Sequence, residues 1–424
     1  MKKISVLMLM LFTLFMLSAC DNGGNIQAVQ APHPPEQSGN PSTRTVEASN
    51  IAAGLRANTT TFETALFSAM PTGENYMISP FSLRMALAMA ANGAYGVTQA
   101  EILTALGIDD LDLFNQVAAA FIKNANANEL VEFNVANSIW LNEDLFDCDV
   151  DFTYDFKRII TEYFAGAAEG VCAVFGADRV NAWISQQTNN RINDVVADDV
   201  FSPENMTLAL LVNAIYFNGN WAYQFDPMLT RDDIFTDRNG SESTILFMEQ
   251  RGNFSYYEND YFRMLAKPYE DKNIRMYFVL PRGDERLPFG MFEDAIDNMR
   301  TAYVRFRLPR FTTEFLHDNL VGILQGMGVI DAFRWQYANF IDMFTELPGD
   351  WRAYIGDILQ KTFIEVDEEG TEAAAATVIE MRVYRSASPP PQPIPFYCNV
   401  PFIYFIRNDA TGDILFMGEF AFAE

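Results

Sequence analysis

Asp-Glu-Glu-Gly-Thr-Glu-Ala-Ala-Ala-Ala-Thr, residues 367–377, is the segment that decides the fold of this chain. Gly370 lets the backbone pivot, because a glycine has no Cβ to restrict its dihedral angles. Nearly all of the following side chains are small, so they meet little resistance on entering between two strands. The segment predicts a strand that can insert into a β-sheet and that is joined to an exposed loop. The residues expected to hinge and insert are Glu368, Gly370, Thr371, Ala373, Ala374, Ala375, Ala376 and Thr377.

The pattern of faces in this segment supports insertion. Side chains of a strand alternate between its two faces. One face would carry only small or apolar side chains, namely Thr371, Ala373, Ala375, Thr377, Ile379 and Met381. No proline interrupts residues 367–388, so nearly every amide can join a β-ladder. The alternative is a permanent helix, because alanine and glutamate are good helix formers.

Composition excludes several classes of function. The chain has 424 residues, of which 49% are hydrophobic, and this is enough for one large domain with a sizeable core. Its formal charge of −27 repels nucleic acid at long range, so we expect no nucleic-acid partner. No internal repeat or second linker interrupts residues 51–424, which we therefore interpret as a single domain.

The N-terminus predicts export and a lipid anchor. Lys2 and Lys3 precede an apolar run, residues 4–17, which is too short to favour a membrane-spanning helix. The run ends in Leu-Ser-Ala-Cys20, which resembles the bacterial lipoprotein signal. We expect residues 1–19 to be a signal peptide and Cys20 to carry the lipid. The alternative is an ordinary secretory signal, with Cys20 incidental.

Residues 20–50 predict a disordered, lipid-anchored tether. They are rich in Gly, Pro, Ser, Asn and Gln and show little apolar clustering. About 30 flexible residues have an average end-to-end distance of roughly 30 Å. The expected location is therefore the surface of a bacterial membrane or cell, with the lipid bilayer as a partner through Cys20.

Catalytic and metal chemistry is sparse. The only histidines are His33, in the tether, and His317, which we place on the surface of an amphipathic helix over Glu314–Met327. The sequence has no phosphate-binding loop, Rossmann fingerprint or Cys-x-x-Cys pair, so we expect no cofactor and no structural zinc. Enzyme function is disfavoured, although a carboxylate-based glycosidase stays open as an alternative.

Helical and strand-like segments are mixed without regular alternation, which indicates an α+β fold with large sheets. Helices are expected over Thr59–Met70 and Phe81–Asn92, and Thr98-Gln-Ala-Glu101 predicts a capping box before Ile102–Leu106. Apolar or alternating runs predict strands at Phe133–Leu141, Thr207–Phe217, Ile274–Leu280, Tyr303–Leu308, Lys361–Val366, Phe402–Arg407 and Ile414–Phe420.

Several segments, in matching order, resemble the serpin family over residues 52–424. They are residues 75–89, 93–98, 211–221, 367–377, 401–406 and 415–418, with Thr230 and Phe235 at the family's spacing. The resemblance implies a large mixed central sheet, two smaller sheets, about eight or nine helices and an exposed reactive-centre loop at about residues 368–395. It also implies that Ser79, Ser82, Asn213, Trp221 and Gln360 lie beneath the sheet where it opens.

Gln360 departs from the family pattern, in which a histidine often hydrogen-bonds near Ser79, Ser82 and Asn213. Glutamine can both donate and accept hydrogen bonds, so we expect the polar network to persist with altered strength. Val400 is a second departure, since a polar residue usually precedes the Pro-Phe pair at 401.

The resemblance implies a monomeric suicide inhibitor of proteases. A protease cuts the loop and forms an acyl-enzyme, and the cleaved loop then inserts into the central sheet. Serine proteases are the expected target class, with cysteine proteases as an alternative. A non-inhibitory serpin that acts as a binding or chaperone-like module is the competing interpretation, and such relatives tend to carry bulky, charged or proline residues where this chain has alanines.

The bait bond has two candidate positions. The family's common spacing from Glu368 predicts cleavage between Tyr384 and Arg385, which suits a chymotrypsin-like protease. A loop longer by one residue places cleavage between Arg385 and Ser386, which suits a trypsin-like protease. Val383 would suit an elastase-like protease.

A disulfide between Cys148 and Cys172 is our hypothesis for the exported chain. If 133–141, a helix near 151–164 and a strand at 169–175 form a parallel crossover, both strand ends lie on one side of the sheet. Cys398 would remain a buried free thiol. Mass mapping under non-reducing conditions is expected to recover the two linked peptides, and alkylation of both thiols would contradict the bridge.

Overall fold

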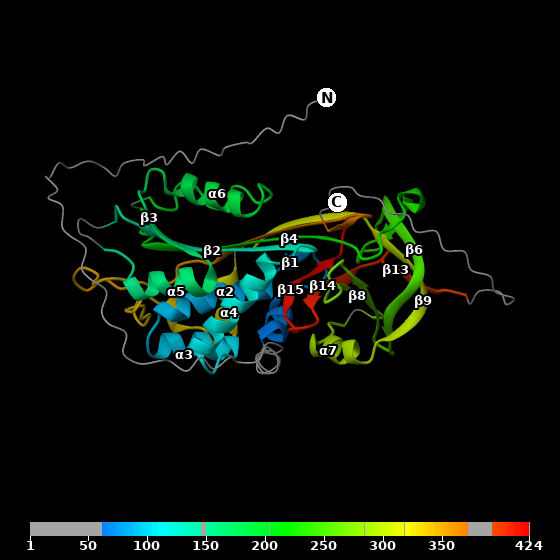
Figure 1. Cartoon of the computed structure of the whole chain (residues 1–424), viewed down its shortest axis with the longest axis horizontal. Helices are drawn as coiled ribbons and strands as arrows, with labels where there is room; N and C mark the ends of the chain where they lie inside the picture. Colours follow the sequence, from blue (N-terminus) through cyan, green and yellow to red (C-terminus); the bar gives the residue numbers. More distant parts are fainter. Residues whose placement is uncertain are drawn as a thin grey trace, which may run out of the picture. The chain divides into compact units, whose positions relative to one another are not determined.

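Two β-sheets and their covering helices form the computed structural model, shown in Figure 1. It describes residues 62–145, 150–202, 204–283, 285–317, 319–371 and 392–423. All of them belong to one compact unit, residues 46–424. The predicted signal peptide and almost all of the predicted tether precede this unit, and both lie outside the described residues. The mixture of helices and sheets confirms the α+β class.

The six-stranded sheet contains Gly370 and Thr371 of the segment quoted first. In the described part of the chain its strands run in the order β10 (Phe311–His317), β11 (Leu359–Val366), β12 (Gly370–Thr371), β4 (Ala209–Asn220), β2 (Val131–Asn142) and β3 (Ala167–Val171). Figure 1 shows helix α6 (Gly176–Gln187) on one face of this sheet and α2 (Pro80–Gly93) on the other. Because both faces are covered, β4 is apolar along most of its length.

The second sheet combines the two smaller sheets that we expected. Its described strands are β1 (Tyr76–Ile78), β15 (Ile414–Phe420), β14 (Phe402–Asn408), β8 (Ile274–Pro281), β7 (Phe262–Pro268), β6 (Glu242–Glu258), β9 (Arg300–Pro309) and β13 (Ile394–Tyr397), with β5 (Arg231–Thr236) paired to β6. β6 is 17 residues long and pairs with β5, β7 and β9. This length joins the two expected sheets into one continuous ladder.

Helices cover the sheets where their sequences predict apolar faces. Residues 62–69 are helical, and the remaining helices not yet given are α3 (Val97–Leu106), α4 (Leu111–Asn126), α5 (Tyr154–Phe164), α7 (Gly290–Asp297) and α8 (Leu320–Gly326). Two short 3₁₀ turns cover Pro227–Leu229 and Asp331–Phe333. Ser79 caps α2 by accepting a hydrogen bond from Ser82 N, and Pro80 takes the first helical position.

The predicted helix over Glu314–Met327 is wrong in its first part. Residues 311–317 form strand β10, with burial alternating along it, and they pair with β11. His317 is only 7% exposed, and its Nε2 lies 3.0 Å from Met77 O, so the prediction of a surface histidine is also wrong. The period-two pattern and a neighbouring strand outweighed the weaker helical signal, which is met only by α8.

The predicted capping box is also wrong. α3 begins at Val97 after Gly96, whose φ of 65° suits a glycine. Thr98 Oγ1 instead accepts a hydrogen bond from Asn339 N at 3.1 Å. Glu101 Oε2 accepts from Ile330 N and Asp331 N at 2.8 and 2.7 Å. Both side chains therefore fasten a distant segment rather than their own helix.

The predicted crossover unit is present. β2 and β3 pair in parallel, with α5 between them in the chain. Cys172 follows β3 and is exposed, whereas Cys148 lies outside the described residues, so the disulfide stays a prediction. Cys398 is buried, and burial raises the pKa of its thiol well above the usual value. Within the described ranges, no helix has the length and apolarity needed to span a bilayer.

Candidate functional site

We call residues 368–371 the hinge, and its end is already part of the six-stranded sheet. Thr371 pairs with Val366 of β11 on one side and with Gly219 of β4 on the other. A tight turn precedes it, in which Asp367 Oδ1 accepts hydrogen bonds from Glu369 N and Gly370 N at 2.8 and 3.0 Å. The hinge therefore enters the gap between β11 and β4 with its first residue pair in place.

Gly370 is required by a close approach of two backbones. A Cβ built on it would lie 2.2 Å from Gly219 O and 2.8 Å from Asn220 Cα. It is not among the glycines with positive φ, so the structure assigns it a steric role in place of the left-handed pivot that its residue type allowed. Only glycine lets the chain enter the ladder this near to β4.

Thr371 is fully buried at the entry to the gap. Its Oγ1 lies 2.7 Å from Tyr269 OH, and both residues have 0% exposed surface. Tyr269 stacks on Trp221 with the ring centres 4.5 Å apart. Thr371, one of the residues predicted to enter the sheet, thus rests against Tyr269, which stacks on Trp221; we call these two rings the platform.

Trp221 and Glu368 hold the hinge from outside the gap. Trp221 Nε1 donates to Asp367 O at 3.0 Å, and its backbone N donates to Glu369 O at 2.8 Å. Glu368 is 3% exposed, accepts from Arg310 Nε at 2.7 Å and is also bonded to Thr230 Oγ1. A buried carboxylate needs such partners, because leaving it unpaired is costly.

Lys267 lies beneath this platform and was missed by the sequence reasoning. Its ammonium is 5.1 Å from the Trp221 ring centre and 4.1 Å from that of Phe225. Nζ donates to Tyr223 O and Gln250 Oε1, both at 2.7 Å. Burial lowers the pKa of this amine well below its usual value. The available signal was one lysine within an otherwise mostly apolar strand, Phe262–Pro268.

The polar network predicted around Gln360 is present, fully buried beneath β4 and β11. Gln360 Oε1 accepts from Ser79 N at 2.8 Å, and its Nε2 donates to Ser79 O and Asn213 Oδ1, both at 3.1 Å. Ser82 Oγ donates to the same Asn213 oxygen. Asn213 Nδ2 donates to Asn137 Oδ1 at 2.7 Å, which adds a residue that the sequence did not single out. Glutamine therefore supplies both a donor and an acceptor here.

The network lies where the sheet is still closed. Leu359–Thr362 of β11 pair directly and in parallel with Val212–Ile215 of β4, and Gln360 is opposite Asn213. Beyond this pairing the hinge separates the two strands. The sheet is thus split at one end and closed at the other, and a longer insertion has to break the closed part.

The remaining predicted site residues lie outside the described part of the chain. They are Ala373, Ala374, Ala375, Ala376, Thr377, Tyr384, Arg385 and Ser386. The chain is described again from residue 392, and β13 pairs in parallel with β9.

Comparison with known proteins gives one consistent result. The family model "Serpin (serine protease inhibitor)" matches residues 57–422. An uncharacterised serpin-like protein of Thermococcus kodakarensis is 32% identical over 81% of this chain and 80% of its own length. A leukocyte elastase inhibitor of Xenopus tropicalis is 32% identical over 82% of this chain and 93% of its own length. The native crystal structure of the thermophilic serpin tengpin superposes with a TM-score of 0.77 at 28% identity, covering 90% of this chain and 96% of that one.

This chain belongs to the serpin family. Its fold is the serpin fold. Serpins are protease inhibitors and generally not enzymes themselves, which agrees with the scarcity of catalytic chemistry in the sequence.

The buried amine makes a pH-dependent prediction. An unfolded lysine titrates near pH 10.4, and the native pKa of Lys267 is lowered, so between the two values the unfolded state holds more protons. Stability contributed at this position therefore rises with pH in that window, by about 1.4 kcal/mol per pH unit. We expect the urea unfolding midpoint of wild type to rise relative to that of Lys267→Met as the pH increases from 7 toward 10. The variant shares every other titrating group, so a constant difference would show that the native amine keeps an ordinary pKa.

Proposed function

We propose that this serpin inhibits serine proteases by trapping them covalently. The observation that carries the proposal is the seating of Gly370 and Thr371 between β11 and β4, ahead of the small residues 373–377. A strand that has begun to enter a gap, and whose next side chains are small, is prepared to continue once its far end is released. Bulky, charged or proline residues at these positions would oppose that continuation.

The proposed chemistry takes place in the protease. Its serine Oγ attacks the carbonyl carbon of Tyr384, the bond to Arg385 nitrogen breaks, and the new amine leaves with a proton. The residue 384 carbonyl is then an ester on the protease. The serpin's part is mechanical, because insertion of the freed segment beside β4 carries the ester and the protease away before water hydrolyses the bond.

Two groups of contacts regulate this movement. The platform of Trp221 and Tyr269 holds the hinge at the entry to the gap between β11 and β4. The buried network of Gln360, Asn213 and Ser79 holds the part of the sheet where β11 and β4 still pair directly. Full insertion exchanges the direct pairing of β11 with β4 for pairing of both strands with the loop. A hinge that stays seated but stops at the network keeps the loop available as bait.

Tyr384 favours a chymotrypsin-like target, and cleavage after Arg385 would instead indicate a trypsin-like one. A cysteine protease can form the equivalent thioester. Incubation with chymotrypsin, trypsin and elastase, followed by denaturing electrophoresis, is expected to show a covalent complex with at least one of them. The mass of the released C-terminal peptide identifies the bond. Cleavage by each protease without a complex would favour the non-inhibitory alternative.

Thr371→Arg is expected to convert the inhibitor into a substrate. The side chain is fully buried against Tyr269, and an arginine there would have to bury an unpaired charge or leave the sheet. We expect the yield of complex to fall at least about tenfold, which corresponds to about 1.4 kcal/mol in partitioning, while cleaved serpin accumulates. Thr371→Ser keeps the hydroxyl and is the matched control. Equal yields for all three proteins would contradict the insertion mechanism.

We further propose that the protein acts as a monomer, exported and anchored to a bacterial membrane or cell surface through a lipid on Cys20. The Leu-Ser-Ala-Cys motif and the polar residues after it support this location. Cys20→Ser is expected to move the protein from the membrane fraction to the soluble exported fraction without changing its inhibition of a soluble protease. An unchanged membrane fraction would contradict the anchor.

A further inference from the structure

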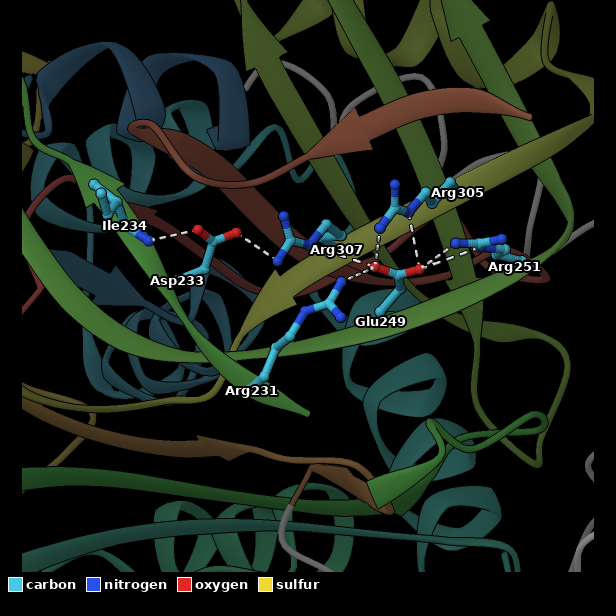
Figure 2. A network of polar contacts seen from close by, with 7 residues as sticks. All are labelled: Arg231, Asp233, Ile234, Glu249, Arg251, Arg305 and Arg307. Carbon is cyan, nitrogen blue, oxygen red and sulfur yellow. Dashed lines mark hydrogen bonds and ion pairs between the residues drawn. The ribbon is translucent and has the colours of Figure 1, made fainter. Parts of the chain in front are cut away.

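Three neighbouring strands concentrate arginine side chains on one carboxylate. Figure 2 shows Glu249 at the centre, with guanidinium groups directed toward it from β5, β6 and β9. We call this group the arginine cluster, and it comprises Arg231, Asp233, Glu249, Arg251, Arg305 and Arg307. In each strand the two cluster members are two residues apart, so they share a face of the sheet.

Glu249 organises the cluster from beneath. Its side chain is 5% exposed, and Arg305 binds it through two hydrogen bonds, of 2.8 and 2.6 Å. Arg251 donates to Oε1 at 3.2 and 3.1 Å, and Arg231 donates to Oε2 at 3.2 Å. Hydrogen bonds from Arg305, followed by those from Arg251, lower the pKa of this carboxyl against the opposing effect of burial. The carboxylate is therefore ionised. It accepts hydrogen bonds from three guanidiniums, and the fourth, that of Arg307, lies 3.7 Å from it in an ion pair.

The cluster carries more positive charge than its own fold requires. Four arginines face two carboxylates, and Asp233 is paired with Arg307. Arg251 and Arg305 are directly opposite each other in the β6–β9 ladder, where like charges destabilise a sheet. Buried Arg307 Nε has no hydrogen-bond acceptor within the described residues, and its ion pair with Glu249 Oε2 is 3.7 Å long. In a chain with a net charge of −27, this is a local reversal of sign.

Two of the four guanidiniums face solvent. The side chains of Arg231 and Arg251 are 57% and 54% exposed, whereas those of Arg305 and Arg307 are 29% and 15% exposed. The inner pair fixes Glu249, and Glu249 in turn orients the outer pair. The result is a pre-organised pair of exposed cations, which costs little ordering entropy when an anion binds.

The cluster adjoins β13, the strand that follows the predicted reactive-centre loop in the chain. The guanidiniums of Arg305 and Arg307 lie 5.7 and 5.5 Å from the ring centre of Tyr397 in β13. From Arg385 to Ile394, where β13 begins, the chain can extend at most about 30 Å. A protease of about 240 residues has a radius of gyration of about 18 Å. A protease bound to the bait bond therefore reaches the surface that carries Arg231 and Arg251.

We propose that Arg231 and Arg251, oriented by Glu249, form a docking surface for an Asp- and Glu-rich surface segment of the target protease. This rests on the proposed inhibitory function and adds a basis for selecting among proteases that would cut the same loop. The net negative charge of the chain repels such a segment at long range, whereas the arginine cluster attracts it. Exposed charges of this kind change association rates and their dependence on salt.

The direct test uses a fluorescein-labelled octaglutamate peptide and fluorescence anisotropy at low and physiological salt. We expect wild type to bind it more tightly at low salt, and Arg231→Gln/Arg251→Gln to bind at least about tenfold more weakly. Arg231→Lys/Arg251→Lys keeps the charge and should retain most of the binding. Arg158→Gln/Arg179→Gln removes the same charge from arginines that pair with carboxylates elsewhere, Arg158 with Asp155 and Glu162 and Arg179 with Glu169, and should bind like wild type.

The kinetic test uses whichever protease forms the covalent complex. If that protease docks on Arg231 and Arg251, octaglutamate slows complex formation by wild type. Arg231→Gln/Arg251→Gln then forms the complex more slowly than the control variant Arg158→Gln/Arg179→Gln. Equal rates for both variants, together with no peptide binding, would overturn the docking surface while leaving inhibition intact. Binding of dextran sulfate without binding of the peptide would overturn it too, because it would identify a polysaccharide site. Absence of a covalent complex with every protease would instead overturn the proposed function.

Discussion

A short parallel pairing between β11 and β4 is the contact on which the rest of this structure depends. Leu359–Thr362 and Val212–Ile215 hydrogen-bond directly, although the hinge has already separated the same two strands at one end. A buried backbone amide must have a partner, so the two strands either pair with each other or accept a third strand between them. Either arrangement would satisfy these backbone groups, and the present structure is close to the first.

The side chains around this pairing contact either the hinge or the part of the sheet where β11 and β4 pair directly. Above it, Thr371 rests on Tyr269 and Trp221, and the turn before it is held through Glu368. Below it, Gln360 and Asn213 tie the facing strands to helix α2. Hydrogen bonds in such a dry interior are costly to leave unmade, so the network resists a partial opening more than a complete exchange of partners.

Two sites with basic side chains stand out from the rest of the chain. The net charge of the chain is −27, yet four arginines gather around one glutamate beside β13. Lys267 adds a buried amine under the hinge platform, held by carbonyl oxygens and aromatic rings without a carboxylate. The arginine cluster places positive charge beside β13, in a chain whose net charge repels other anions at long range.

Local patterns in the sequence determined the class of fold, most of the strands and the identity of the hinge. Alternation, apolar runs and a row of small residues act over neighbouring positions, so they can be read without a structure. The polar network around Gln360 could be anticipated because the resemblance named its members. His317 and the Thr98 capping box could not, since β10 and the 330–339 segment compete with local helix signals through contacts made at long range. Only the tertiary structure decided how deeply the hinge is seated, why Gly370 must be a glycine, and that arginines from three strands meet at Glu249, because each depends on backbones far apart in the chain coming within a few ångströms of one another.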